Sequence, residues 1–432
     1  MNSKLTGLLK SKNSVGMNLQ ASALKFTNLC WVSAMVDACF YFQVHQPYRL
    51  RHYQIFDIGK NHEYYDEKKN KEILNRVVNK CYLPTNRLLL ELIKKYPEFK
   101  VSFSFSGTVL EQLEQYEPEA LESFKELVKT KNVEILDETY HHSLAFIYSR
   151  NEFKRQVVLH NKKIKSVFKF APKVFRNTEL IYNNDLAYMI EKMGYKAILS
   201  EGADKILGWR SPNFVYKAHG TENLKVLLKN YRLSDDIAFR FSNPNWPGFP
   251  LTAEKYASWI SEIKEDVVNL FLDYETFGEH QWPETGIFEF LKKLPEEFIK
   301  RKIGFKTPSE IIKNCKSAGE FNSYGFISWA DIERDLSAWL GNELQQAAIK
   351  ELYNMEDEIL KTRDERLIED WRRLQTSDHF YYMCIKWFSD GDVHKYFNPY
   401  DNPYDAFITF INILNDLRER TQKINSQKSD KN

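Results

Sequence analysis

Short apolar runs alternate with amphipathic segments along most of the chain. The runs are rich in β-branched and aromatic residues, which is typical of strands that are buried on both faces. They lie at residues 39–44, 101–105, 133–136, 174–175, 196–199, 236–241 and 267–272. Between the runs, apolar residues recur at helical spacing. This alternation predicts right-handed βαβ units and a parallel sheet of about seven strands.

Polar and acidic residues gather where these runs end. HQP follows the first run at residues 45–47, DETYHH follows the third at residues 137–142, Glu179 lies just beyond the fourth, and DYETFGEH follows the last at residues 273–280. An open, doubly wound sheet would also satisfy the alternation. A barrel is favoured because a closed ring of strands brings all of these ends together. We expect the barrel to span residues 35–302.

The pattern changes after Lys302. TPSE at residues 307–310 is a capping box with proline at the first helical position. From there the spacing predicts helices almost throughout, interrupted by a loop at residues 389–403. We expect a helical subdomain over residues 303–420 and a frayed polar tail over residues 421–432.

Residues 1–34 stand apart from this organisation. Lys4, Lys10 and Lys12 precede an apolar stretch, which gives the segment a faint likeness to a signal peptide. The apolar stretch continues directly into the first expected strand. A second interpretation is therefore that translation starts at Met35, which would leave residues 1–34 as a disordered arm or a misassigned start.

Composition excludes several classes of function. The net charge is +2 with 28% charged residues, so no basic surface for nucleic acid or an anionic membrane is indicated. No run reaches the roughly 18 apolar residues of a membrane helix. The five cysteines include no CxxC pair, so we predict a reduced, cytoplasmic protein. No HExxH or other motif for a metal site is present. The oligomeric state stays open.

Two acids at expected strand ends are candidates for glycosidic chemistry. Glu179 and Asp273 can face a glycosidic oxygen, one as nucleophile and the other as general acid/base. The acid must keep its proton near neutral pH, which requires burial or a nearby like charge. Acids at similar positions are Glu138, Glu201, Glu275 and Glu279. Spacing alone does not choose among them.

One segment of the second half combines acidic and aromatic residues. On a helical wheel of residues 329–342, Asp331, Asp335 and Trp339 fall within about 80° of each other. An aromatic ring beside two acids suits carbohydrate binding, although an amphipathic helix with a solvated face explains the same pattern. His45 and Gln46 could hydrogen-bond a sugar hydroxyl, and TSDH at residues 376–379 has a similar polar character.

These stretches together resemble glycoside hydrolase family 57, and its archaeal and bacterial α-amylase group in particular. The resemblance rests on HQP at residues 45–47, FRNTELIYNN around Glu179, LDYETFGEH at residues 272–280 and ISWADIERDLSAWLGN at residues 327–342. It implies an incomplete (β/α)7 barrel followed by a C-terminal α-helical subdomain that closes one side of the cleft. It also implies Glu179 as nucleophile and Asp273 as acid/base of a retaining mechanism on α-glucans, without a metal or organic cofactor. The substrate-binding residues expected by this resemblance are His45, Gln46, His142, Trp282, Trp329, Asp331, Asp335, Trp339, Asp378 and His379.

The favoured function is thus a retaining hydrolase of 1,4-α-glucans of the α-amylase type. A 4-α-glucanotransferase or branching enzyme of the same family is the alternative, because only the acceptor of the glycosyl group differs. A glycan-binding relative without activity should lack one of the two acids, and both are present. A metal-dependent polysaccharide deacetylase would need an Asp and two spaced histidines, which the adjacent His141 and His142 do not supply.

Overall fold

The computed structural model describes residues 36–386 and 397–429. The extension predicted at residues 1–34 lies outside the described residues, as does most of the loop predicted at residues 389–403. Seven strands run parallel around a barrel in the order β1–β2–β3–β4–β5–β7–β8 and back to β1. Their bounds are β1 Asp37–Val44, β2 Val101–Phe105, β3 Val133–Ile135, β4 Val174–Arg176, β5 Ala197–Glu201, β7 Lys225–Lys229 and β8 Val267–Asp273.

Two pairs of neighbouring strands in the ring are each joined by a single pair of residues. One bridge, between Asp137 and Phe175, joins β3 to β4, and one pair, Lys229 with Asn269, joins β7 to β8. Three short strands lie outside the ring: β6 Tyr216–Ala218 is antiparallel to β7, β9 Gly304–Phe305 pairs with β1, and β10 Glu320–Phe321 pairs with β6. The predicted (β/α)7 barrel is confirmed.

The helices within the first 314 residues connect or follow the strands of the barrel in sequence. They are α1 Glu67–Val77, α2 Leu83–Lys95, α3 Gly107–Tyr116, α4 Pro118–Lys129, α5 Ala145–Tyr148, α6 Arg150–Phe168, α7 Asn184–Lys192, α8 Asp204–Leu207, α9 Tyr231–Ala238, α10 Ala253–Ser261, α11 Ile287–Lys300 and α12 Pro308–Asn314. Single helical turns are η1 Ile55–Asp57, η2 Val78–Tyr82, η3 Thr178–Leu180, η4 Tyr274–Thr276 and η5 Pro283–Thr285. The predicted capping box is present at α12, where the Thr307 and Glu310 side chains each accept a backbone N–H of the other residue.

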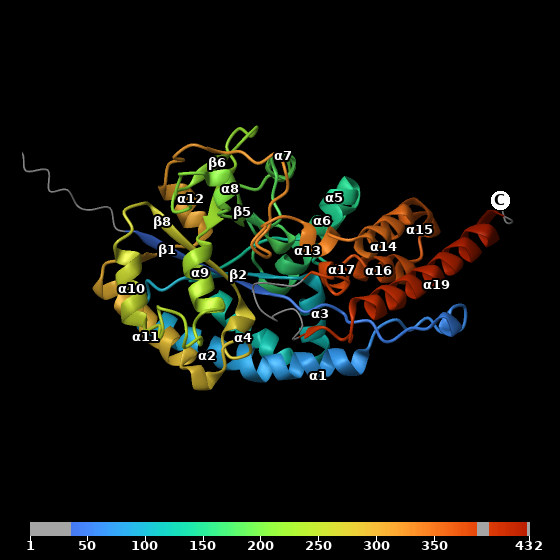
Figure 1. Ribbon diagram of the computed structural model, residues 1–432, viewed down its shortest axis with the longest axis horizontal. Helices are drawn as coiled ribbons and strands as arrows, with labels where there is room; N and C mark the ends of the chain where they lie inside the picture. Colours follow the sequence, from blue (N-terminus) through green and yellow to red (C-terminus); the bar gives the residue numbers. More distant parts are fainter. Residues whose placement is uncertain (1–35, 387–396, 430–432) are drawn as a thin grey trace, which may run out of the picture. The chain divides into compact units, whose positions relative to one another are not determined.

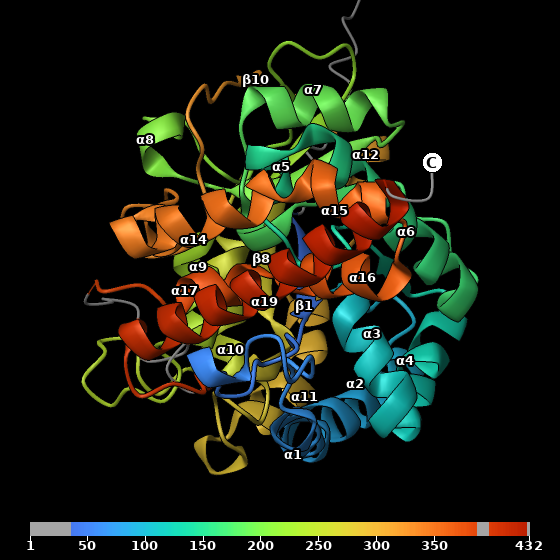
Figure 2. The same cartoon turned by 90° about the vertical axis from the view of Figure 1, so that its right-hand side faces the viewer.

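The later helices are α13 Ser337–Leu340, α14 Glu343–Asn354, α15 Glu356–Thr362, α16 Glu365–Arg373, α17 Ser377–Tyr381 and α19 Pro403–Ser429. Figures 1 and 2 show α14–α17 and α19 grouped beside one end of the barrel. The C-terminal helical region is therefore present. Within the described part of the chain, no helix combines the length and apolar character that a bilayer crossing requires.

The strand expected at residues 236–241 was wrong. The strand of this unit is β7 Lys225–Lys229, and α9 Tyr231–Ala238 follows it. The Asn230 side chain accepts the backbone N–H of Leu233 and starts the helix. Ile237 and Phe241, four residues apart, are both buried, so their apolar character reflects a helical face and its continuation rather than a strand.

The helix expected over residues 329–342 was also wrong. Only α13 is helical there, and Asp331 and Arg334 adopt left-handed backbone with φ of 52° and 47°. The Asp335 carboxylate accepts both the N–H and the hydroxyl of Ser337. Such local side-chain bonds compete with helix formation. Residues 315–336 as a whole are irregular apart from β10, and the tail expected after residue 420 is instead helical as far as Ser429.

Candidate active site

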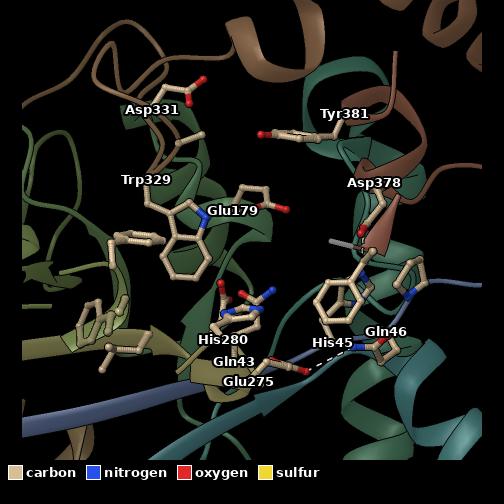
Figure 3. Close-up of a pocket in the computed structure, with 18 of the residues that line it drawn as sticks. Gln43, His45, Gln46, Glu179, Glu275, His280, Trp329, Asp331, Asp378 and Tyr381 are labelled. Atoms are coloured by element: carbon tan, nitrogen blue, oxygen red, sulfur yellow. Dashed lines mark hydrogen bonds and ion pairs between the residues drawn. The ribbon is translucent and has the colours of Figure 1, made fainter. Parts of the chain in front are cut away.

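A pocket of about 1100 Å³, open to solvent, lies at the carboxyl ends of the barrel strands. Its lining comes from β1, β7 and β8, from the η3 turn that follows β4, from residues 329–331 and from the C-terminal helical region. Figure 3 shows Trp329 and Asp331 on one side of it, Asp378 and Tyr381 on the other, and Glu179 between them. Residues far apart in sequence thus meet in one cavity, as expected at this end of a parallel barrel.

Glu179 sits in the η3 turn that follows β4, with a left-handed φ of 56°. Three side chains donate to its carboxylate: Trp329 Nε1 to Oε2 at 2.7 Å, Ser377 Oγ to Oε1 at 3.1 Å, and His142 Nε2 to Oε1 at 3.2 Å. Donors favour the ionised form of a carboxyl group. The surroundings of Glu179 therefore suit a carboxylate that is charged and fixed in orientation.

His142 lies directly behind this carboxylate. Its Nδ1 is 3.0 Å from Glu138 Oε2, so the imidazole bridges two acids. Burial alone would lower the pKa of His142, but the hydrogen bonds to Glu138 and Glu179 outweigh burial and raise it to about 9. At neutral pH the ring is therefore cationic, and both of its nitrogens donate.

Asp273 occupies the end of β8, beside Gln43 in the register of β1. Burial, together with the charge of Glu179, raises the pKa of Asp273 to about 6. The positive charges of Arg176, Lys229 and His142 oppose this rise. Two carboxyl groups of one pocket thus differ in environment: one is surrounded by donors, and the other keeps its proton up to near neutral pH.

The structure shows which of the other candidate acids from the sequence line the pocket and which do not. Glu138 is buried behind His142, Glu279 is buried against Arg76 Nε at 2.9 Å, and Glu201 is buried near Lys229. None of these three lines the pocket. Glu275 does line it, and burial together with the charge of Asp273 raises the pKa of Glu275 to about 8.

The sequence profile of glycosyl hydrolase family 57 matches residues 39–330 of the chain. The chain belongs to this family. It is 46% identical over 395 residues to a Methanocaldococcus jannaschii protein whose name provisionally assigns it as an alpha-amylase, covering 88% of this chain and 83% of that protein.

Solved structures show the same fold. The GH57-type branching enzyme of Pyrococcus horikoshii has a TM-score of 0.63 at 15% identity and covers 90% of this chain and 95% of its own. The 4-alpha-glucanotransferase of Thermococcus litoralis has a TM-score of 0.58 at 16% identity and covers 80% of this chain and 56% of its own.

Several predicted site residues of this family 57 protein do reach the pocket. Beside the two acids, they are His45, Gln46, Trp329, Asp331 and Asp378. His45 Nε2 donates to Asp378 Oδ2 at 2.9 Å, and its Nδ1 is 2.7 Å from Ser106 Oγ. Burial and the neighbouring His142, whose ring stacks at 4.0 Å, lower the pKa of His45. Despite its burial, the contact with His45 holds the pKa of Asp378 well below its usual range.

Five predicted substrate-binding residues do not line the pocket. His142 is buried behind Glu179, to which its Nε2 donates. Trp339 is only 1% exposed and packs in the core beside the ring of Tyr381, at 6.3 Å. His379 is buried against the ring of Phe410. Asp335 bonds Ser337, as described above, and Trp282 is 54% exposed outside the lining. Trp339 and Asp335 were misplaced because the helical wheel assumed a helix that does not form.

Sequence reasoning also missed residues that line the pocket. The main ones are Gln43, Arg49, Lys229, His280, Tyr381 and Phe397. Gln43 and Lys229 carried a signal, since each is a polar residue within or at the end of an apolar strand. Tyr381 carried none, because only folding brings α17 over the barrel. Among the described residues, no group of three or more His, Cys, Asp or Glu side chains is arranged to hold a metal ion.

Proposed function

We propose that this protein is a retaining glycoside hydrolase of 1,4-α-glucans, of the α-amylase type, with Glu179 as nucleophile and Asp273 as acid/base. The observation that carries the proposal is the contrast between the two acids. Glu179 accepts three hydrogen bonds, whereas burial and the charge of Glu179 raise the pKa of Asp273 to about 6. A retaining mechanism requires this pairing of a charged and a protonated carboxyl group.

In the first step, the Glu179 carboxylate attacks the anomeric carbon while Asp273 gives its proton to the glycosidic oxygen. The bond to the leaving sugar breaks, and a glycosyl ester on Glu179 forms. In the second step, Asp273, now ionised, removes a proton from water, which attacks the anomeric carbon and frees the carboxylate of Glu179. A pKa near 6 lets Asp273 exchange its proton in both directions near neutral pH.

The neighbouring side chains support these two steps. His142, Trp329 and Ser377 fix the Glu179 carboxylate, which places the attacking oxygen before substrate binds. His45 and Asp378 form a hydrogen-bonded pair at the pocket wall, where they can orient sugar hydroxyls.

The alternative within the family is transfer of the glycosyl group to another sugar. The names of the relatives keep it open, since enzymes named as a branching enzyme and a 4-alpha-glucanotransferase share this fold. Product analysis on maltoheptaose decides between the two. Only shorter maltooligosaccharides would establish hydrolysis, longer products would establish transfer, and no conversion of any α-glucan would refute the proposal.

We further propose that the protein works in the cytoplasm. Cys39, Cys81, Cys315 and Cys384 form no disulfide. Free thiols are typical of a reducing compartment. Fractionation of the source cells, with the protein followed by antibody, tests this assignment.

A further inference from the structure

Arg176 is the last residue of β4, three positions before Glu179. Its side chain is 0% exposed, and its Nε, Nη1 and Nη2 atoms have no hydrogen-bond partner among the residues that the structure describes. A buried guanidinium without hydrogen bonds is costly and calls for an explanation. The proposed catalytic steps do not use Arg176, since neither acid is bonded to it.

Glu138 and Trp329 both lie next to this guanidinium. Nη1 lies 3.7 Å from Glu138 Oε2, and Cζ lies 4.9 Å from the centre of the Trp329 indole ring. Arginine favours both an acid and an aromatic face. Nζ of Lys229 is 5.4 Å from the centre of the same ring, so the indole contacts two cations.

Glu138 and Trp329 are both connected to the carboxylate of Glu179 by hydrogen bonds. Glu138 binds Nδ1 of His142, whose Nε2 binds Oε1 of Glu179. Trp329 Nε1 donates to Oε2 of Glu179. Arg176 therefore contacts the first member of each of two chains of interactions, and the two chains end on the two oxygens of the proposed nucleophile.

The charge of Arg176 also reaches the other acid. Glu179 raises the pKa of Asp273, and Arg176, Lys229 and His142 lower it. Glu275 and Tyr41 also interact electrostatically with Asp273. Arg176 is the largest of the lowering contributions. Removing this charge would therefore make Asp273 hold its proton to higher pH.

We propose that Arg176 is a positioning residue of the active site: it holds Glu138 and Trp329 in the arrangement that orients the carboxylate of Glu179. This inference rests on the proposed function. It explains why a charged side chain without hydrogen bonds is kept inside the barrel.

The test compares Arg176→Met, Arg176→Lys and wild type by pH profiles of kcat/KM on maltoheptaose. Arg176→Met removes the charge at similar length, and Arg176→Lys retains it without the planar group. The control is Arg210→Met, because Arg210 also stacks on an aromatic ring, that of Tyr216 at 5.4 Å, but lies outside the pocket lining.

For Arg176→Met we expect kcat to fall at least about 10-fold with KM changed less than about threefold, because orientation rather than binding is lost. The basic limb, which marks loss of the Asp273 proton, should move up by roughly one pH unit. Arg176→Lys should keep the basic limb of wild type while kcat stays reduced, and Arg210→Met should match wild type in both.

Folded Arg176→Met with the kcat and basic limb of wild type would overturn the inference. If that variant does not fold, Arg176→Lys decides, since full activity with lysine would show that the planar guanidinium positions nothing. An inactive wild type would instead refute the proposed function, so the two failures are distinguishable.

Discussion

The indole of Trp329 offers a direct test of how Glu179, the proposed nucleophile, is held. Trp329→Phe removes the Nε1–H that donates to Glu179 Oε2 at 2.7 Å. It keeps an aromatic ring near Arg176 and Lys229. The backbone bond from Trp329 N to Glu179 O, at 3.2 Å, does not depend on the side chain. The substitution therefore deletes one donor from the carboxylate with little other change.

The size of the effect follows from the chemistry of that bond. A hydrogen bond to a charged group contributes about 1.5–3 kcal/mol, which corresponds to roughly 10- to 150-fold in rate. This range is an upper limit, because the bond also stabilises the carboxylate before reaction. His142 and Ser377 donate to Oε1, whereas Trp329 donates to Oε2, so the substitution removes a donor that orients Oε2. We expect kcat to fall about 10- to 100-fold.

The assay is steady-state hydrolysis of maltoheptaose, with thermal unfolding to confirm folding. Trp246→Phe is the matched control, because Trp246 packs against Trp259 outside the pocket lining. The control should retain kcat within about twofold. A folded Trp329→Phe enzyme with the kcat of wild type would show that the indole N–H does not orient Glu179.

Two further predictions concern Glu275, which lines the pocket, and Trp339, which is buried in the core. Burial raises the pKa of Glu275 from 4.5 to about 8, so folded Glu275 binds a proton that the unfolded chain releases above pH 4.5; stability should therefore fall as pH rises from about 4.5 to 8. Glu275→Gln should reduce that slope in denaturant unfolding while activity at pH 7 stays within about fivefold, and an unchanged slope would contradict the assignment. Trp339→Ala should destabilise the fold by about 3–5 kcal/mol, as expected for a buried Trp, whereas Trp209→Ala, at a side chain that is 95% exposed, should cost less than about 0.5 kcal/mol. Equal melting temperatures for these two variants would show that Trp339 does not pack in the core.

The barrel could be predicted because its strands are continuous apolar runs with polar ends. β1 and β8 show this most clearly. β7 was missed because its sequence, KVLLK, is short and bounded by lysines. The neighbouring DIAFRF has a pattern that suits a strand, but the Asn230 cap at the preceding helix start decides its structure. The helix cap at Asn230 therefore outweighed the alternating apolar pattern of residues 236–241.

Glu179 and Asp273 could be proposed as catalytic acids from their positions after strands, but their surroundings could not be predicted. Nothing in the sequence places Ser377 or Trp329 on Glu179, because these contacts join residues 198 and 150 positions apart. The face of Trp339 was misjudged because Asp335 bonds Ser337 locally and no helix spans residues 329–342. The periodicity of apolar residues does not reveal long-range contacts or local side-chain hydrogen bonds.

The roles of Glu179 and Asp273 are tested most directly by azide rescue with an aryl α-maltoside. The aryl group leaves with little protonation, so Asp273→Ala should still form the glycosyl ester on Glu179, and azide should then attack it without base assistance. Two inversions predict an α-glycosyl azide from Asp273→Ala. Glu179→Ala should give at most a β-glycosyl azide, by direct attack. A β-azide from Asp273→Ala, or an α-azide formed only by Glu179→Ala, would contradict the assignment.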